Sequence, residues 1–196
     1  MNSELRERAG QFAKTYVLGP LFLAAMVGIG SCAPAATLPG TALGTYSVVG
    51  TLGTNTCGSG IGADNPWDVT VQLSQDDGPT LYLAQSDGSN EVTGAASAAV
   101  SASATTTGSL TSVVTANVDG SDAGAEGHCD LTLATTFTLS LAAGSPPPSF
   151  KGTAVYVYSA ATVASNSDCT DQLSSSGGKY STLPCTVNYS LSAKRQ

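Results

Sequence analysis

Strict two-residue alternation of apolar and polar residues is the feature that most constrains the fold of this chain. The alternation runs over residues 67–74, 131–141 and 186–192. Successive side chains of a β-strand point to opposite faces of a sheet, whereas a helix needs apolar residues at spacings of three and four. The same segments are rich in Thr, Val and Tyr, which favour strands. The alternation therefore predicts strands that bury one face.

Short clusters of Asp, Gly, Ser, Asn and Pro separate these segments and predict the turns between strands. Eight strands are expected, at 44–53, 67–75, 79–85, 91–103, 108–118, 129–142, 150–164 and 184–192. Connections this short favour an antiparallel meander, closed into a barrel or folded into a sandwich. The predicted fold class is all-β, with a signal peptide and a short linker before the domain.

The N-terminal segment has the pattern of a secretory signal peptide. Basic residues among the first 14 positions precede an uncharged apolar run over 17–29. The run ends in Ile29-Gly30-Ser31-Cys32. This tetrapeptide resembles the lipobox of bacterial lipoproteins, with Ile29 in the aliphatic position, Gly30 and Ser31 in the small positions and Cys32 at the lipidated position.

The lipoprotein resemblance implies a processing step and an address. A diacylglyceryl group would be attached to the sulfur of Cys32 and the chain cut before it, so the acyl chains, palmitate among them, would bind a membrane. The chain then divides into a signal peptide (1–31), a lipidated N-terminus with a linker (32–43) and a β domain (44–196). Ala33, which follows the cysteine, implies the outer membrane in a host with two membranes, on its periplasmic or surface face.

Three other readings of the N-terminal segment stay open at this stage. Ordinary signal peptidase would cut after Ala33-Pro34-Ala35 and release a free protein. The uncharged run over 15–32 is just long enough for an uncleaved anchor helix, although Pro20 weakens it. A cytoplasmic protein with a chance apolar start is the third reading.

Four cysteines remain in the domain once Cys32 is assigned to the lipid. In an exported domain they predict two disulfides with three conceivable connectivities. An up-and-down meander places all four at one end of the fold. There the closed meander favours Cys129–Cys169 and Cys57–Cys185, and the alternative pairs Cys169 with Cys185 and Cys57 with Cys129. The spacings do not fit a zinc site, which needs two ligands about two residues apart.

Charge and motif content exclude several function classes. Seven Lys and Arg stand against 14 Asp and Glu, a formal net charge of −7, so nucleic acid, which is bound through basic residues, is not an expected partner. The single histidine, His128, has no nucleophile elbow to serve, and we predict no catalytic residue. Carboxylates over 119–126 lack the spacing of a calcium loop. No metal ligand and no cofactor are predicted.

Aromatic residues are the remaining candidates for a ligand site. The sole tryptophan, Trp67, follows a Gly-rich loop over 55–66 and has the alternation phase of the core. Tyr156 and Tyr158 share one face of the seventh predicted strand. Because the mouths of barrels are common ligand sites, these three residues are the predicted ligand-facing positions, with core packing as the alternative.

Two further resemblances concern the domain itself. Gly44-Thr45-Tyr46 is similar to the opening of lipocalin-type barrels, without the tryptophan of that family. The segments Asn55–Gly58, Pro66-Trp67 and Leu183–Tyr189, together with the lipobox, resemble uncharacterised bacterial surface lipoproteins. The expectation is a lipid-anchored envelope protein, most simply a non-enzymatic binding or surface-structural module. The alternatives are a carrier of a small apolar ligand inside a barrel and, less favoured, an envelope hydrolase using His128.

Overall fold

The structure is a computed structural model that describes residues 38–62, 65–86, 91–118, 128–161 and 167–196. The predicted signal peptide, the lipobox and Cys32 lie outside the described residues, as do the carboxylates over 119–126. No described helix is long and apolar enough to cross a bilayer.

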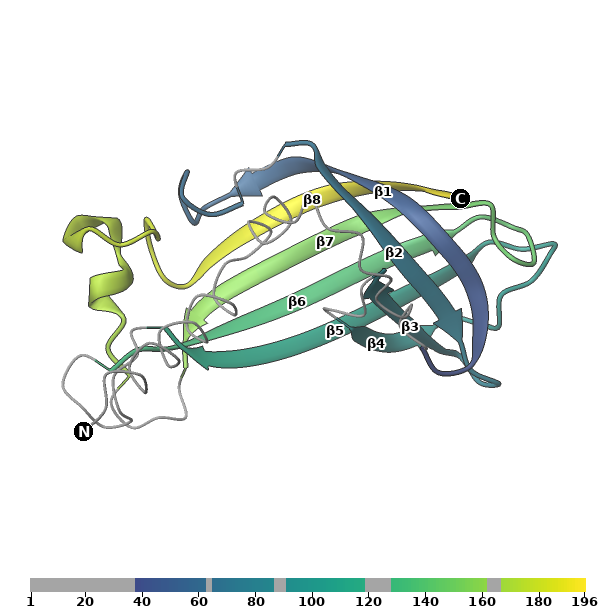
Figure 1. The fold of residues 1–196 in the computed structure, drawn as a ribbon, viewed down its shortest axis with the longest axis horizontal. Coiled ribbons are helices and arrows are strands. Elements are labelled where there is room, and N and C mark those ends of the chain that lie inside the picture. Colours follow the sequence, from purple (N-terminus) through teal and green to yellow (C-terminus); the bar gives the residue numbers. More distant parts are fainter. Residues whose placement is uncertain (1–37, 63–64, 87–90, 119–127, 162–166) are drawn as a thin grey trace, which may run out of the picture.

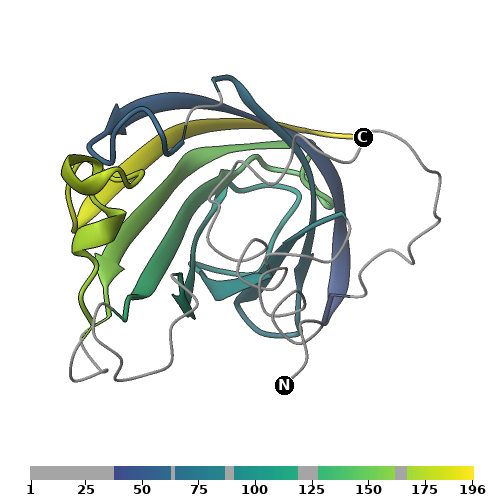
Figure 2. The same ribbon diagram turned by 60° about the vertical axis from the view of Figure 1, so that its left-hand side comes forward.

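Eight antiparallel strands form a closed barrel in chain order, with β1 paired to β8 (Figures 1 and 2). This confirms the predicted all-β meander and selects the barrel over the sandwich. The strands are β1 (Thr41–Asn55), β2 (Trp67–Gln75), β3 (Thr80–Gln85), β4 (Val92–Ala96), β5 (Thr106–Asn117), β6 (Asp130–Leu141), β7 (Ser149–Ala160) and β8 (Cys185–Arg195).

The predicted end of the fourth strand and the predicted start of the first strand are wrong. The fourth strand ends at Ala96 and not at residue 103, because the chain beyond it turns across the end of the barrel. There the side chain of Gln75 binds the backbone at Ala98 and Val100. In addition, β1 begins at Thr41, inside the predicted linker, and Leu43 already packs in the core.

The interior of the barrel is filled by the side chains that the alternation pointed inward. In β6, for example, the lumen-facing positions from Leu131 to Leu141 are apolar with the exception of Thr135. At the end of the barrel where β1 begins, Tyr46 and Phe150 contact each other with ring centroids 5.2 Å apart. The hydroxyl of Tyr46 donates to the carbonyl oxygen of Pro147 at 2.9 Å. This end has a packed core.

The opposite end carries all four cysteines and is called the cysteine end. The ends of β1, β5 and β7 and the starts of β6 and β8 lie there, at the left of Figure 1. Cys57 is bonded to Cys185 and Cys129 to Cys169, which confirms the favoured pairing. The first disulfide joins the β1–β2 connection to the start of β8, and the second joins the β5–β6 and β7–β8 connections. Two single turns of 3-10 helix, η2 (Thr170–Gln172) and η3 (Ser174–Ser176), lie in the last of these.

Strands β3 and β4 are short, and their shortness shapes the barrel wall (Figure 1). The pairing of β4 with β5 ends at Thr93 and Thr111, and the pairing of β2 with β3 ends at Val71 and Gln85. Within the described chain, no strand therefore lies between residues 67–69 of β2 and residues 113–117 of β5. We call this stretch the side opening; it lies toward the cysteine end.

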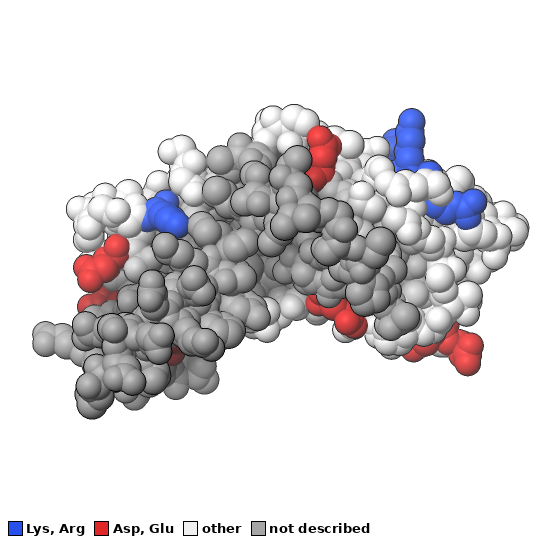
Figure 3. Space-filling view, in the orientation of Figure 1, with Lys and Arg blue, Asp and Glu red and all other residues white. Residues whose placement is uncertain are grey.

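Charge is sparse on the described surface. Figure 3 shows that the visible described surface is mostly uncharged on this face. Residues 92–118, which include β4 and β5, contain no Asp, Glu, Lys or Arg. The wall on one side of the side opening therefore carries no charge.

Candidate functional site

Four aromatic side chains meet inside the barrel and form what we call the aromatic layer. Trp67 lies 5.5 Å from Tyr189 and 6.4 Å from Tyr156 between ring centroids. Tyr156 contacts Tyr189 at 6.2 Å and Phe137 at 6.3 Å, both edge to face. Offset and edge-to-face geometries are the favourable ones for aromatic pairs. The layer joins strands β2, β6, β7 and β8 across the lumen.

A glycine makes room for the indole of this layer. Gly50 of β1 is the direct cross-strand partner of Trp67. A Cβ atom on Gly50 would lie 2.7 Å from the indole Cε3, which is closer than real side chains come. The indole therefore lies over the bare backbone of Gly50.

Between the aromatic layer and the side opening, the lumen-facing side chains become partly exposed. Leu110 of β5 is fully buried, whereas Val114, on the same face of that strand, is 47% exposed. Ser112 of β5 and Leu133 of β6 are partly exposed, and Thr135 of β6 is buried. These four residues, Ser112, Val114, Leu133 and Thr135, form a surface that we call the trough. The exposure of Val114 shows that the lumen reaches solvent here.

The β1–β2 connection covers the far side of the aromatic layer. The side chain of Asn55 donates to the carbonyl oxygens of Gly58 and Ile61, at 3.2 and 2.7 Å, and its oxygen accepts from the N–H of Cys57. These bonds hold Ile61 in the core at 2% exposure. The hydroxyl of Tyr189 donates to the carbonyl oxygen of Gly62 at 3.1 Å. The β1–β2 connection thus holds the aromatic layer in place from the cysteine end of the barrel.

A second aromatic pair adjoins the layer. The rings of Tyr158, on β7, and Tyr180, in the β7–β8 connection, lie 5.5 Å apart. Both side chains are 1% exposed. Neither hydroxyl has a hydrogen-bond partner, and the same is true of the indole N–H of Trp67. Burial raises the pKa of Tyr180 to about 12 and raises those of Tyr156 and Tyr158 further, so all three are neutral at physiological pH.

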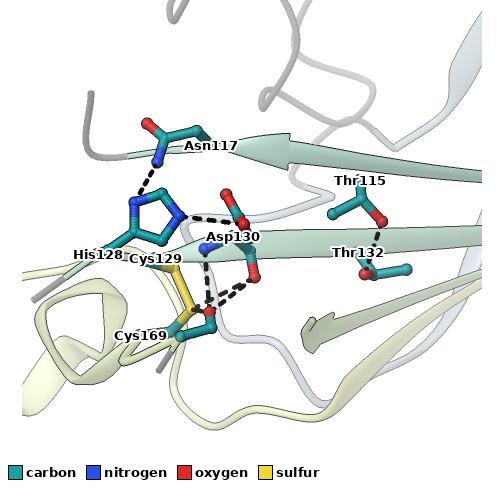
Figure 4. A network of polar contacts seen from close by, with 8 residues as sticks. Thr115, Asn117, His128, Cys129, Asp130, Thr132 and Cys169 are labelled. Carbon is teal, nitrogen blue, oxygen red and sulfur yellow. Dashed lines mark hydrogen bonds and ion pairs between the residues drawn. A yellow bond between two sulfur atoms is a disulfide. The ribbon is translucent and has the colours of Figure 1, made fainter. Parts of the chain in front are cut away.

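His128 belongs to a polar network at the edge of the cysteine end (Figure 4). Its Nδ1 lies 3.0 Å from the side-chain nitrogen of Asn117, and its Nε2 lies 3.1 Å from a carboxylate oxygen of Asp130. Its backbone carbonyl accepts from the N–H of Asp168, and its side chain is 4% exposed. The hydroxyl of Ser167 binds the backbone of Asp130 and not the imidazole. The described contacts of His128 tie β5 to β6 next to the Cys129–Cys169 disulfide.

The structure offers less support for a metal site than for the aromatic site. The four cysteines of the domain are bonded in pairs, so none offers a thiolate to zinc. The described residues hold no group of three or more His, Cys, Asp or Glu side chains that would suit a metal ion.

A pocket of about 520 Å³ lies against β1, β2 and the end of β3. Its described lining contains no aromatic side chain and consists of Ser47, Val48, Val49, Asp68, Val69, Thr70, Gln85 and Ser86. It is open to solvent and its lining includes the carboxylate of Asp68, whereas the trough and the aromatic layer carry no charged side chain.

The structure brings together the three residues that the sequence singled out. Trp67, Tyr156 and Tyr158 all face the lumen at the cysteine-end half of the barrel. Tyr189 and Phe137 were not predicted as site residues from the sequence, although both have the alternation phase of the core. Tyr180 gave no signal, because it lies in a connection without periodicity.

The fold and this site define a disulfide-braced, eight-stranded antiparallel barrel with an aromatic layer below a side opening. Comparison of the chain with protein-family models, with curated proteins and with solved structures gives no match.

Proposed function

We propose that this chain is a lipid-anchored envelope protein whose barrel binds a small apolar ligand between the side opening and the aromatic layer. The observation that carries the proposal is the exposure of Val114, a lumen-facing valine whose cross-strand partner, Leu133, is in turn paired with the buried Tyr158. The interior of an eight-stranded barrel is either filled by side chains or holds one small ligand. Apolar walls with a few polar groups are the usual lining of such sites.

The composition of the trough limits the ligand. Val114, Leu133 and the rings of the layer offer apolar contact, and Ser112 and Thr135 offer hydroxyls. The lumen-facing residues of the trough and the aromatic layer carry no charged side chain. Burying an ionised group without a partner is costly, so the proposed ligand is uncharged.

The anchor is the second part of the proposal and is supported by the sequence. Ile29-Gly30-Ser31-Cys32 follows the apolar run at the position of a lipobox. Two or more acyl chains on Cys32 would hold the barrel at a membrane, since stable anchoring needs more than one chain. Intact mass of the membrane-extracted protein tests this: the proposal expects acyl mass on a chain that begins at Cys32. Envelope association that survives Cys32→Ser would overturn the anchor.

Binding is tested with N-phenyl-naphthylamine, an uncharged apolar dye that brightens in apolar surroundings, and with the fluorescence of Trp67. We expect the dye to bind and to quench Trp67. Val114→Asp places a carboxylate in the trough and should weaken binding at least tenfold. Val113→Asp is the matched control, because its side chain points to the outer face and is 69% exposed. Equal affinity in the two variants, or no binding by the parent protein, would refute the ligand site.

A further inference from the structure

Three buried hydrogen-bond donors near the trough lack partners, whereas comparable donors in the barrel have them. The hydroxyls of Tyr46 and Tyr189 each donate to a backbone carbonyl oxygen. The hydroxyls of Tyr158 and Tyr180 and the indole N–H of Trp67 bind nothing. Native proteins pair nearly all buried polar groups, so each exception requires an explanation.

The position of these donors relates them to the proposed site. Trp67 is part of the aromatic layer, with an indole that is 6% exposed. Tyr158 follows Tyr156 by two residues on β7 and therefore faces the same lumen. Tyr180 packs against Tyr158 from the β7–β8 connection. The unpaired donors are thus at the layer or on its cysteine-end side.

The protonation state of these groups defines what they bind. A neutral tyrosine hydroxyl donates one hydrogen bond and an indole N–H only donates. Burial keeps the tyrosine hydroxyls protonated, because it disfavours the phenolate. No lysine, arginine or histidine side chain accompanies them among the lumen-facing residues of β7 and β8 at this level. The site is therefore suited to an oxygen acceptor and unsuited to a carboxylate.

We propose that the ligand is an uncharged, largely apolar molecule with a carbonyl, ether or hydroxyl oxygen, and that Tyr158 and Tyr180 form its oxygen-binding subsite. The apolar part of the ligand lies along the aromatic layer and the trough, and the Trp67 N–H is a second donor to it. This inference rests on the proposed function, since it names the chemistry of the ligand that the barrel takes.

The test compares three probes that share an unbranched ten-carbon skeleton: decane, methyl octyl ketone and decanoate. They are titrated into the full chain with Cys32→Ser, which carries no acyl chain that could compete for the lumen. Trp67 fluorescence and calorimetry report binding. We expect the ketone to bind about tenfold more tightly than decane, the effect of one well-made hydrogen bond. Decanoate should bind more weakly than either, because its charge has no partner.

Tyrosine-to-phenylalanine variants assign the preference to the two hydroxyls. Tyr158→Phe with Tyr180→Phe removes both donors but keeps both rings, so decane should bind as before and the ketone should lose its tenfold advantage. Tyr46→Phe is the matched control, because its hydroxyl lies at the opposite end of the barrel and is bonded to the chain itself. It should leave the preference intact.

The outcomes separate this inference from the proposed function. Equal affinity for decane and the ketone, or a preference that persists in the double variant, would overturn the oxygen subsite and leave the apolar site standing. The two hydroxyls would then be satisfied by water alone. If no probe binds, the proposed function fails and the inference fails with it.

Discussion

Gly50 and Trp67 face each other across the β1–β2 pair, and the indole occupies the space that a side chain on Gly50 would need. Gly50→Ala introduces a Cβ at 2.7 Å from the ring. The indole must then shift within a packed layer, and overpacking of this kind costs about 1–3 kcal/mol. We expect a lower urea midpoint and a changed Trp67 emission spectrum. Gly53→Ala, on the same strand at an exposed position, is the control and should leave the spectrum unchanged.

Gln75 closes the end of the barrel opposite the cysteines. Its amide donates to the carbonyl oxygen of Ala98 at 3.3 Å and accepts from the N–H of Val100 at 2.9 Å, while its own side chain is 5% exposed. Gln75→Leu leaves these backbone groups without their partners, and the expected loss is about 1–3 kcal/mol. Amide exchange at Val100 should accelerate. Gln72→Leu, whose side chain is on the outer face of β2, should change stability by less than about 0.5 kcal/mol; a similar loss in both variants would contradict this role of Gln75.

The sequence predicted most of the fold because the apolar alternation of long strands has one physical cause, the burial of one face. β2 begins and ends where the pattern predicted. The predicted end of the fourth strand was wrong because residues 97–103 are Ser, Ala and Val, whose local preferences fit both a strand and a turn. Beyond β4, the chain is held across the barrel end by the side chain of the distant Gln75, which accepts from the N–H of Val100, and local composition does not indicate this contact.

The site was predictable in part for the same reason. Trp67, Tyr156 and Tyr158 lie in periodic strands, so their lumen-facing positions followed from their phase. The side opening could not be predicted from the sequence, because it depends on how many residues of β3 pair with β2 and how many residues of β4 pair with β5. Tyr180 reaches the lumen through the path of a connection that the Cys129–Cys169 and Cys57–Cys185 disulfides flank. Such a path is a property of the tertiary structure.

The two disulfides should differ in their contribution to stability. Cys57–Cys185 spans 128 residues and Cys129–Cys169 spans 40. In the chain-entropy model a longer closed loop restricts the unfolded chain more, by about 5 against about 4 kcal/mol. We expect the Cys57→Ala/Cys185→Ala protein to lose more stability in urea than the Cys129→Ala/Cys169→Ala protein. The reverse order would show that local packing, and not loop closure, dominates.

Among the described residues, the edge of β5 beyond Thr111 has no strand partner, and it is a site of expected self-association. Alternate hydrogen bonding to β6 points the backbone groups of Val113 and Thr115 toward the side opening. The strand carries no charge, and both Val113 and Val114 are exposed. Unprotected edges of this kind pair with other chains, and a lysine blocks such pairing. Val113→Lys should therefore reduce association in sedimentation at rising concentration. Val49→Lys, on a strand paired on both sides, should have a smaller effect.

Alkaline pH should unfold the barrel through its buried tyrosines. The pKa of Tyr180 is raised to about 12 by burial, and that of Tyr158 is also raised. An unfolded tyrosine ionises near pH 10. The stability that these residues contribute is therefore complete below about pH 10 and declines as pH rises toward 12, since only the unfolded chain releases the proton. Each tyrosine adds at most about 1.4 kcal/mol per pH unit to the slope. Urea midpoints between pH 8 and pH 12 should show a shallower decline for Tyr180→Phe than for the parent chain. An unchanged slope would mean that the Tyr180 hydroxyl is hydrated in the folded barrel.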